Sequence, residues 1–363
     1  RAWRPVRLLS GRSSLAYGGS ATPRLSPFFS ALSRRLTIMA TTLIALGANL
    51  GQRRDNLRRA MELLDGAPST RVVARSHWFS TAPIGGPAGQ GQFVNAAVRA
   101  ETSLSPYQLL ALVRDVETSL GRQRRERWAA RSVDLDLLLF DDLVLKSEEL
   151  ELPHPRMAFR RFVLEPAADV AADMMHPVIG WTIGQLLNHL NTAADYVALT
   201  GLPGVGKTKL AQRVAAETAS RFIADPAEAS PPPEVSLCQA LATEQSRWCQ
   251  RAAMLSRRRW TAESSAAISD FWLGQSWAYS RLWQGDQPGA DLAAGCGISD
   301  AEVVQPKLLV LLAPPVVPKR WEALRTELRR LVFQRGRGPM LQLDASKPDA
   351  ALVELRAAIE AMR

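Results

Sequence analysis

Two aspartates two residues apart, Asp134 and Asp136, are the pair in this sequence best suited to hold a metal ion. They fall in a stretch of alternating residues that predicts a strand, so both carboxylates project from one face. Val133, Leu135 and Leu137 then face the other way. Two carboxylates this close repel each other, and a hard cation between them removes the repulsion. A solvated strand face is the plainer alternative for the pair taken alone.

A run of arginines directly precedes the pair. Within ten residues the chain carries Arg122, Arg124, Arg125, Arg127 and Arg131. Guanidinium groups bind phosphate oxygens in a bidentate manner, so arginines beside a carboxylate pair suit a magnesium-bound polyphosphate. Such a run alone is more often a solvated loop. Together, the two features favour phosphate chemistry on a nucleotide.

Strands and helices from Met39 onward follow a pattern that would hold these residues in place. Hydrophobic periodicity predicts strands at 42–46, 71–80, 92–101 and 132–140, and helices at 52–64 and 105–120. This order fits an α+β, ferredoxin-like sheet. A tail of loops is expected after residue 140, ended by a helix at 183–190.

Seven short segments of this half occur in the order and spacing of a known family. They are GANLG at 47–51, STAPIG at 80–85, QFVN at 92–95, VE at 116–117 with GR at 121–122, RW at 127–128 with Arg131, DLD at 134–136, and PHP at 153–155 with RRF at 160–162. In these residues the chain resembles the 6-hydroxymethyl-7,8-dihydropterin pyrophosphokinase family, over roughly residues 42–180.

The resemblance implies an enzyme that transfers pyrophosphate from ATP to 6-hydroxymethyl-7,8-dihydropterin, which gives AMP and the pterin diphosphate for folate biosynthesis. It implies that Asp134 and Asp136 hold two magnesium ions that bridge the phosphates of the co-substrate ATP. The catalytic set implied by position is Arg122, Arg131, Asp134, Asp136 and Arg160. The ATP contacts implied in the same way are Glu117, Arg122, Arg124 and His154.

The same resemblance implies a pterin site. The pterin is flat and has a guanine-like edge, which needs aromatic faces and amide groups around it. Phe93 and Phe162 match the stacking side, and Asn95 and the backbone from Thr81 to Ile84 match the edge. Trp128 matches a loop residue that closes over the site, and such closure excludes water from the transferring group.

The second half begins with a phosphate-binding motif. A predicted strand at 196–200 runs into GLPGVGKT at 201–208 and then into a helix, which is the context that a P-loop requires. The motif supplies Gly201, Gly204, Gly206, Lys207 and Thr208. Backbone amides and the helix N-terminus would cradle phosphates, Lys207 would reach the β- and γ-phosphates, and Thr208 would bind magnesium. The motif predicts an α/β, P-loop NTPase-type domain with a parallel sheet.

The rest of this half resembles the deoxynucleoside kinase family. RFIADP at 221–226 matches a strand that ends in the catalytic acid, so Asp225 would be the base, and ISD at 268–270 places Asp270 as a second candidate. Where the family often has arginine after the second acid, this chain has Phe271, and no arginine-rich lid follows the strand expected at 307–313. Two interpretations of the second half remain: it is a deoxynucleoside kinase, or it is a degenerate nucleotide-binding module without catalysis.

The length of the chain indicates its number of domains, and the distribution of charge indicates its partners. With 363 residues, two domains are expected, at 39–192 and 193–363. Residues 1–38 hold seven arginines and no acid, so they supply +7 of the net charge of +10. We therefore expect no nucleic-acid partner. Because Met39 directly precedes the first strand, we favour a disordered extension upstream of the natural start; a targeting segment is the alternative.

The cysteines and the apolar runs indicate in which compartment the protein is expected. Cys238, Cys249 and Cys296 are spaced unlike a metal site, and we expect a reducing cytoplasm without a disulfide framework. The longest apolar runs are too short to span a bilayer. The expected partners are therefore small molecules, namely ATP, the pterin and, under one reading, a deoxynucleoside, with no membrane and no nucleic acid.

Overall fold

The computed structural model describes residues 39–85, 89–121, 131–226, 237–260, 266–284, 292–293 and 296–363. The predictions for residues 1–38, and for Arg122, Arg124 and Trp128, lie outside these ranges. In the described part of the chain, no helix is both long and apolar enough to cross a membrane.

The first sheet is antiparallel, with strands in the order β2-β4-β1-β5. Its members are β1 (Ala40–Ala48), β2 (Thr70–Arg75), β4 (Phe93–Thr102) and β5 (Asp134–Phe140), and the short β3 (Phe79–Thr81) also pairs with β4. A separate two-stranded sheet joins β6 (Leu145–Lys146) to β7 (Glu151–Leu152). In the register of the main sheet, Gly47 lies opposite both Asn95 and Asp134. Near the C-terminal end of β1, Gly47 therefore has one predicted site residue on each side, Asn95 in β4 and Asp134 in β5.

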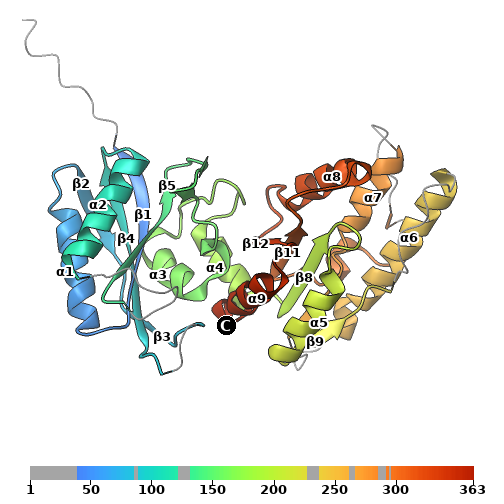
Figure 1. Cartoon of the computed structure of the whole chain (residues 1–363), viewed down its shortest axis with the longest axis horizontal. Helices are drawn as coiled ribbons and strands as arrows, with labels where there is room; N and C mark the ends of the chain where they lie inside the picture. Colours follow the sequence, from blue (N-terminus) through green and yellow to red (C-terminus); the bar gives the residue numbers. More distant parts are fainter. Residues whose placement is uncertain are drawn as a thin grey trace, which may run out of the picture. The chain divides into compact units, whose positions relative to one another are not determined.

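The two faces of this sheet pack against different helices (Figure 1). Side chains alternate along β1, so that Ile44 and Leu46 lie in the cluster under α1 (Arg53–Asp65) and α2 (Pro106–Ser119), whereas Leu43 lies in the cluster on the opposite face. That opposite face packs against α3 (Arg161–Ala171), which in turn packs on α4 (Ile183–Thr192). Helix α2 begins with a capping box between Ser105 and Gln108.

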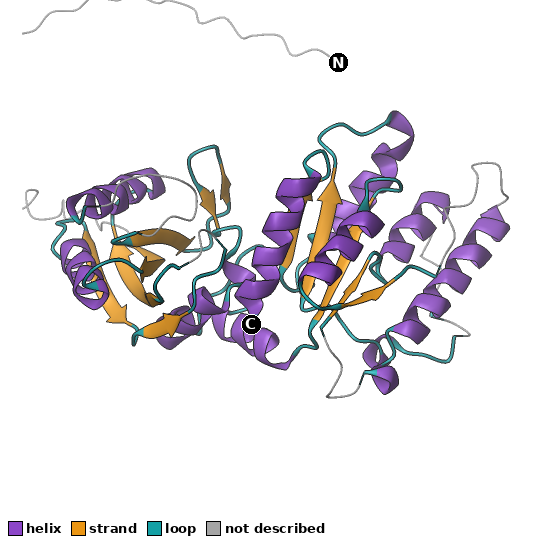
Figure 2. Ribbon diagram, turned by 60° about the horizontal axis from the view of Figure 1, so that its bottom comes forward, coloured by secondary structure: helices purple, strands orange, loops and turns teal. Residues whose placement is uncertain are grey.

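The second sheet is parallel throughout, with strands in the order β12-β11-β8-β10-β9. The strands are β8 (Tyr196–Gly201), β9 (Arg221–Ile223), β10 (Ala267–Ser269), β11 (Leu308–Ala313) and β12 (Met340–Asp344). Helices lie on both faces, as Figure 2 shows. These are α5 (Lys207–Glu217) and α9 (Pro348–Met362) on one face, and α6 (Leu237–Met254), α7 (Gln275–Gln284) and α8 (Glu322–Val332) on the other. Burial on both faces explains why β8 and β11 are apolar almost throughout.

One hydrophobic cluster joins elements from both halves of the chain. It contains Phe159 and Leu164 from the segment 157–171, Leu186 from α4, and Leu355 and Ile359 from α9. Helix α3 therefore covers a face of the first sheet, and α3 and α4 both contribute to a cluster that also contains core residues of the second sheet. Between them and β8 the chain needs only residues 193–195.

Most predicted elements are confirmed, with two differences. The strand predicted at 71–80 is two strands, β2 and β3, separated by residues 76–78. The region predicted as loops after residue 140 contains helix α3, which has Pro166 inside it. Proline generally disfavours a helix interior, because it lacks the backbone N–H and its ring crowds the preceding turn. The structure shows that the apolar spacing of Val163, Leu164, Ala167 and Ala171, all buried, outweighs this cost.

Candidate active sites

The carboxylates of Asp134 and Asp136 lie at the start of β5, on one face of the strand. Both are half-buried, while Leu135 and Leu137 between and beyond them are buried in the core under α1 and α2. The alternation predicted from the sequence is therefore the one observed. The two carboxylates line a cavity of about 350 Å³, which we call the first-sheet cavity.

The first-sheet cavity gathers most of the predicted first-site residues that the structure describes. The residues that line it and were predicted to contact the pterin, the phosphates or the metal are Thr81, Ile84, Phe93, Asn95, Arg131, Asp134, Asp136, His154, Arg160 and Phe162. They come from β3 and the loop after it, from β4, from β5 and the residues just before it, and from the segment 154–162. Residues separated by up to 81 positions thus face one space.

Positive charge surrounds the carboxylate pair. Arg131 forms an ion pair with Asp134, and Arg160 lines the same cavity. Burial and the neighbouring Arg156 lower the pKa of Arg160 to about 10, while Asp136 and Asp134 act in the opposite direction. Arg160 therefore stays charged at neutral pH. Its guanidinium lies 5.6 Å from the ring centroid of Phe162, which orients it over an aromatic face.

His154 is held as a neutral ring. Burial, followed by the charges of Arg160 and Arg156, lowers the pKa of His154 to about 3. Its Nδ1 accepts a hydrogen bond from the backbone N–H of Arg156 at 3.2 Å, so the ring proton is on Nε2. The backbone N–H of His154 donates to the carbonyl of Leu138 in β5 at 2.9 Å. The ring can therefore act as a neutral donor tied to the carboxylate strand.

The amide of Asn95 is oriented by a neighbour in the cavity. Its Nδ2 donates to Thr81 Oγ1 at 2.8 Å. A side chain at position 47 would place its Cβ 3.2 Å from Asn95 Oδ1, so glycine there leaves that oxygen room to accept a ligand donor. Phe93 and Phe162 line the same cavity. The arrangement offers an amide edge and two aromatic rings to one flat ligand.

Sequence reasoning missed the residues that hold Arg131 in place. Asn49 is buried, and its Oδ1 accepts from the backbone N–H of Arg131 at 2.8 Å. Its Nδ2 donates to Gln90 Oε1 at 3.0 Å, and Gln90 lines the cavity. The signal that would have found it is its place in GANLG, because a buried asparagine in a loop needs partners.

Glu117 does not line the first-sheet cavity. It is buried on α2, where its Oε1 accepts from the backbone N–H of Leu135 at 2.8 Å. The carboxylate therefore lies behind the strand and fixes the backbone between Asp134 and Asp136. Its predicted role toward ATP stays a prediction.

The residues present fit a magnesium site to which the protein contributes two carboxylates. Asp134 and Asp136 offer hard oxygen donors on one face, which is the donor type that Mg²⁺ prefers. Within the described ranges no group of three or more His, Cys, Asp or Glu side chains is arranged to hold a metal ion. Two carboxylates therefore suit an ion whose other ligands come from phosphate oxygens and water.

The second site is the loop that follows β8. Gly201, Gly204 and Gly206 all have positive φ, and a side chain on Gly201 would collide with the carbonyl oxygen of Leu312. Helix α5 begins at Lys207 directly after them, so its first backbone N–H groups face the loop. Lys207 Nζ donates to the carbonyls of Gly201 and Leu202 at 3.1 and 3.0 Å. The loop therefore has the shape of a phosphate cradle.

Two carboxylates meet at this loop, at the carboxyl ends of parallel strands. Thr208 Oγ1 donates to Asp270 Oδ2 at 2.5 Å, and the other oxygen of Asp270 accepts from the backbone N–H of Asp225 at 2.6 Å. Asp225 and Asp270 follow β9 and β10. The sequence predicted all three residues, and the structure brings them together.

An arginine that the sequence did not suggest completes this cluster. Arg251 on α6 donates through Nε and Nη2 to the two oxygens of Asp225, at 3.0 and 2.7 Å, and through Nη1 to Ser276 at 2.6 Å. Its guanidinium lies 5.8 Å from the ring centroid of Phe271. The resemblance implies an arginine at position 271, and the structure instead places Arg251 of α6 beside Phe271.

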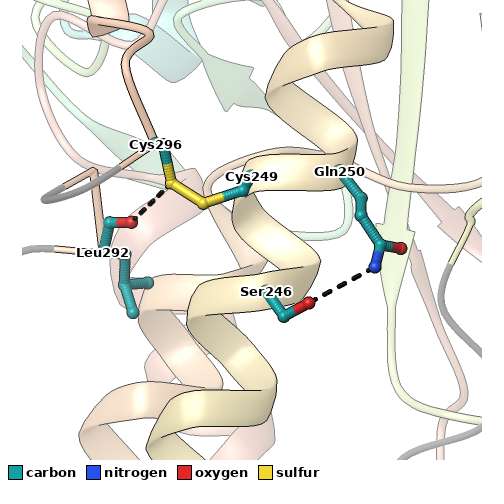
Figure 3. The surroundings of a disulfide bond; sticks show 5 residues. All are labelled: Ser246, Cys249, Gln250, Leu292 and Cys296. Atoms are coloured by element: carbon teal, nitrogen blue, oxygen red, sulfur yellow. Dashed lines mark hydrogen bonds between the residues drawn. A yellow bond between two sulfur atoms is a disulfide. The ribbon is translucent and has the colours of Figure 1, made fainter.

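One prediction about the cysteines is wrong. Cys249 on α6 and Cys296 form a disulfide, with their Cα atoms 5.4 Å apart (Figure 3). Cys296 Sγ also lies 3.4 Å from the carbonyl oxygen of Leu292. The expectation of no disulfide rested on spacing along the chain, and packing of α6 brings together two thiols 47 residues apart.

Comparisons with known proteins place the first half. The family model for 7,8-dihydro-6-hydroxymethylpterin-pyrophosphokinase (HPPK) matches residues 43–172. The 2-amino-4-hydroxy-6-hydroxymethyldihydropteridine pyrophosphokinase of Pseudomonas aeruginosa is 38% identical over 161 residues, which are 44% of this chain and 96% of that protein. The Bacillus subtilis enzyme of the same name is 45% identical over 127 residues, 35% of this chain and 75% of its own. The chain belongs to the HPPK family.

One solved structure shows a weaker likeness to the chain. The structure of a deoxyadenosine kinase from M. mycoides covers 44% of this chain and 95% of its own, with 15% sequence identity and a TM-score of 0.32. A likeness at this level carries no argument about fold or function. The reading of the second half therefore rests on the residues of the loop after β8 and their contacts.

Proposed function

We propose that the chain transfers the β,γ-pyrophosphoryl group of ATP to the hydroxymethyl oxygen of 6-hydroxymethyl-7,8-dihydropterin in a step of folate biosynthesis. The single observation that carries this proposal is that one cavity is lined by the carboxylate pair together with arginine, histidine, amide and phenylalanine side chains, namely Arg131, Arg160, His154, Asn95, Phe93 and Phe162. The strand order β2-β4-β1-β5 supports a ferredoxin-like frame for it, in a domain of residues 39–192.

The chemistry divides among the residues of the cavity. Phe93 and Phe162 stack on the pterin, and Asn95 with the backbone from Thr81 to Ile84 pairs with its edge. The hydroxymethyl oxygen bonds to the β-phosphorus, the bond from that phosphorus to the oxygen bridging to the α-phosphorus breaks, and AMP leaves with that oxygen. The hydroxyl proton is released. The product is the pterin diphosphate.

Phosphate charge has to be neutralised during this transfer. Asp134 and Asp136 would hold magnesium, which supplies charge neutralisation on the phosphate oxygens when bound. Arg160 and Arg131 bind phosphate oxygens directly, and His154 donates from Nε2 to a phosphate oxygen without adding charge. In this proposal Arg122, Arg124 and Trp128 contribute from the segment 122–130, as the family resemblance implies, and Glu117 acts near the nucleotide.

The test is product identity with the full chain, ATP and Mg²⁺. We expect AMP and pterin diphosphate in equal amounts by mass spectrometry. The matched control replaces the substrate by 6-methyl-7,8-dihydropterin, which stacks equally well but lacks the accepting oxygen, and should yield no AMP. Pterin-dependent ADP in place of AMP, or no pterin-dependent AMP, would contradict the proposal.

For the second half, residues 193–363, we propose a P-loop NTPase-type site that binds ATP and phosphorylates deoxynucleosides. The favouring observation is that Thr208, Asp270 and Asp225 form one hydrogen-bonded chain beside Lys207, with Arg251 supplying a buried cation. Asp225 is the candidate base and Asp270 the alternative, while Thr208 and Asp270 would hold a nucleotide-bound magnesium, which would neutralise phosphate charge.

The two activities give different nucleotide products, so one assay separates them. Incubating the full chain with ATP and each deoxynucleoside should give ADP, and Lys207→Ala should abolish it. Lys209→Ala, an exposed lysine on the same helix, is the matched control and should leave the rate unchanged. If no deoxynucleoside yields ADP although wild type binds ATP and Lys207→Ala does not, the non-catalytic alternative holds.

A further inference from the structure

The first-sheet cavity is not built by the first half of the chain alone. Four residues of helix α9, Glu354, Ala357, Ala358 and Ala361, line it together with the residues of β4, β5 and α3. Their spacing of three, four and seven positions places them on one face of the helix. Three of the four are alanines, so this face leaves room for a ligand.

Glu354 makes a specific contact at this wall. Arg156 donates to Glu354 Oε1 through Nη2 at 2.6 Å and through Nε at 3.0 Å. The side chains are 32% and 26% exposed, so the pair is only partly screened by water. Arg156 also lines the cavity. A carboxylate from the second half therefore fixes the position of a cation at the first site.

The contact leads directly to the residues proposed for phosphate binding. The backbone N–H of Arg156 fixes the ring proton of His154, and the charge of Arg156 acts on both His154 and Arg160. Glu354 opposes the effect of Arg156 on Arg160. Without the carboxylate, two arginines would face each other with less compensation, and Arg156 would be free to leave its position.

Helix α9 is itself held in place on two sides. Arg161 at the start of α3 donates to the carbonyl of Met362 at 3.3 Å. On the other side α9 packs on α5, with ion pairs from Arg213 to Asp349 at 2.9 Å and from Arg356 to Glu217 at 3.3 Å. Leu355 and Ile359 are buried in the cluster that both halves share. The wall is therefore a fixed part of the fold.

We propose that helix α9 is part of the pyrophosphokinase site: Glu354 is a positioning residue that holds Arg156 beside His154 and Arg160, and the alanine face is a wall of the substrate cavity. The second half thus completes a site whose reacting groups all come from the first. This inference rests on the proposed pyrophosphokinase function.

The first experiment measures pterin-dependent AMP release by wild type, Glu354→Gln and Glu360→Gln. Glu360 is on the same helix and pairs with Arg356, but it does not line the cavity, so its replacement is the matched control. We expect the KM for ATP to rise about fivefold to tenfold in Glu354→Gln only, because a charge-assisted hydrogen bond is lost. A variant that merely folds less well would lose kcat and keep its KM.

A double-mutant cycle assigns the effect to the contact. In an Arg156→Gln background, Glu354→Gln should have little further effect on the KM for ATP. In the parent chain, Glu354→Asp should raise this KM less than Glu354→Gln does.

Ala357→Leu probes the wall in the same assay, with Ala350→Leu, exposed on the first turn of α9, as its control. We expect Ala357→Leu to raise the KM for at least one substrate about tenfold, because it fills the cavity.

The outcomes separate this inference from the function on which it rests. An active wild type whose KM values stay within twofold in both Glu354→Gln and Ala357→Leu would overturn the role of α9 and leave the proposed function intact. A wild type without pterin-dependent AMP release would overturn the proposed function, and this inference with it.

Discussion

Arg131 and Asp134 form an ion pair inside the first-sheet cavity, so one of the two carboxylates proposed for magnesium is already in contact with a guanidinium. The backbone of Arg131 is fixed by Asn49, which bonds to both its N–H and its carbonyl. The cation is therefore held beside the carboxylate in advance. If the carboxylates hold magnesium as proposed, phosphate oxygens would be neutralised by both the metal ion and Arg131.

Removing either carboxylate charge should nearly abolish the first activity. Asp134→Asn and Asp136→Asn keep the shape of the side chain but lose the anionic oxygen that magnesium needs. We expect kcat/KM for pterin-dependent AMP release to fall about a hundredfold or more. Titration with Mg²⁺ in the same assay should show a higher half-saturating concentration in both variants.

Asp142→Asn is the control for these two variants, because Asp142 is exposed just beyond the end of β5. Its rate and its Mg²⁺ dependence should match those of wild type. Full activity in Asp136→Asn would show that the second carboxylate does not bind metal and would reduce the site to Asp134 alone.

Local patterns predicted the parts of the site that depend on short stretches of chain. The alternation in β5 placed Asp134 and Asp136 on one face, because side-chain direction in a strand repeats every two residues. The glycines before Lys207 predicted the loop after β8, because positive φ favours glycine and the structure has it at Gly204 and Gly206. Both inferences need only the residues within one element.

Contacts between distant elements escaped prediction for a physical reason. Glu354 reads as an ordinary exposed-face glutamate on an amphipathic helix, and only the packing of α9 against α3 brings it to Arg156. In the same way, Arg251 reaches Asp225 because α6 packs on the second sheet. Such contacts depend on how helices are arranged in space, which periodicity does not encode.

Two histidines with lowered pKa values should make the fold sensitive to acid. Burial lowers the pKa of His154 to about 3 and that of His176 to about 4, below the ordinary value of 6.5. Between those values the unfolded chain binds protons that the folded chain excludes, so stability falls as pH drops from 6.5 toward 4. Each histidine contributes up to about 1.4 kcal/mol of unfolding free energy per pH unit there.

The variant that tests this is His176→Asn. The Asn amide oxygen replaces Nδ1 as the acceptor for the backbone N–H of Ile179, a contact of 3.2 Å in the wild type, but it does not titrate. Urea midpoints measured from pH 7 to pH 4 should fall less steeply for the variant than for the wild type. Parallel curves for the two proteins would mean that His176 is not protonated on unfolding.

Nucleotide binding at the second site should weaken above pH 8. Burial lowers the pKa of Lys207 to about 8, although Asp270 and Asp225 act in the opposite direction. Below that pH Lys207 is charged and attracts phosphate, and above it the lysine becomes neutral. Binding at the second site is the part of the binding of a fluorescent ATP analogue that Lys207→Ala removes. We expect the Kd for this part to rise between pH 7.5 and 9. Lys207→Arg, which stays charged, should flatten this dependence; an equally steep rise in that variant would assign it to another group.

The disulfide between Cys249 and Cys296 should be countable in solution. The chain has three cysteines, so alkylation of denatured protein without reductant should modify one thiol, and alkylation after reduction should modify three.

Because the disulfide closes a loop across 47 positions, its loss should lower the free energy of unfolding by about 2–4 kcal/mol. Cys249→Ser should reproduce the loss in thermal stability that reductant causes in wild type, and reductant should change the variant no further. Alkylation of all three thiols without reductant would show that the pair is reduced in the protein as isolated, and the stability difference should then disappear as well.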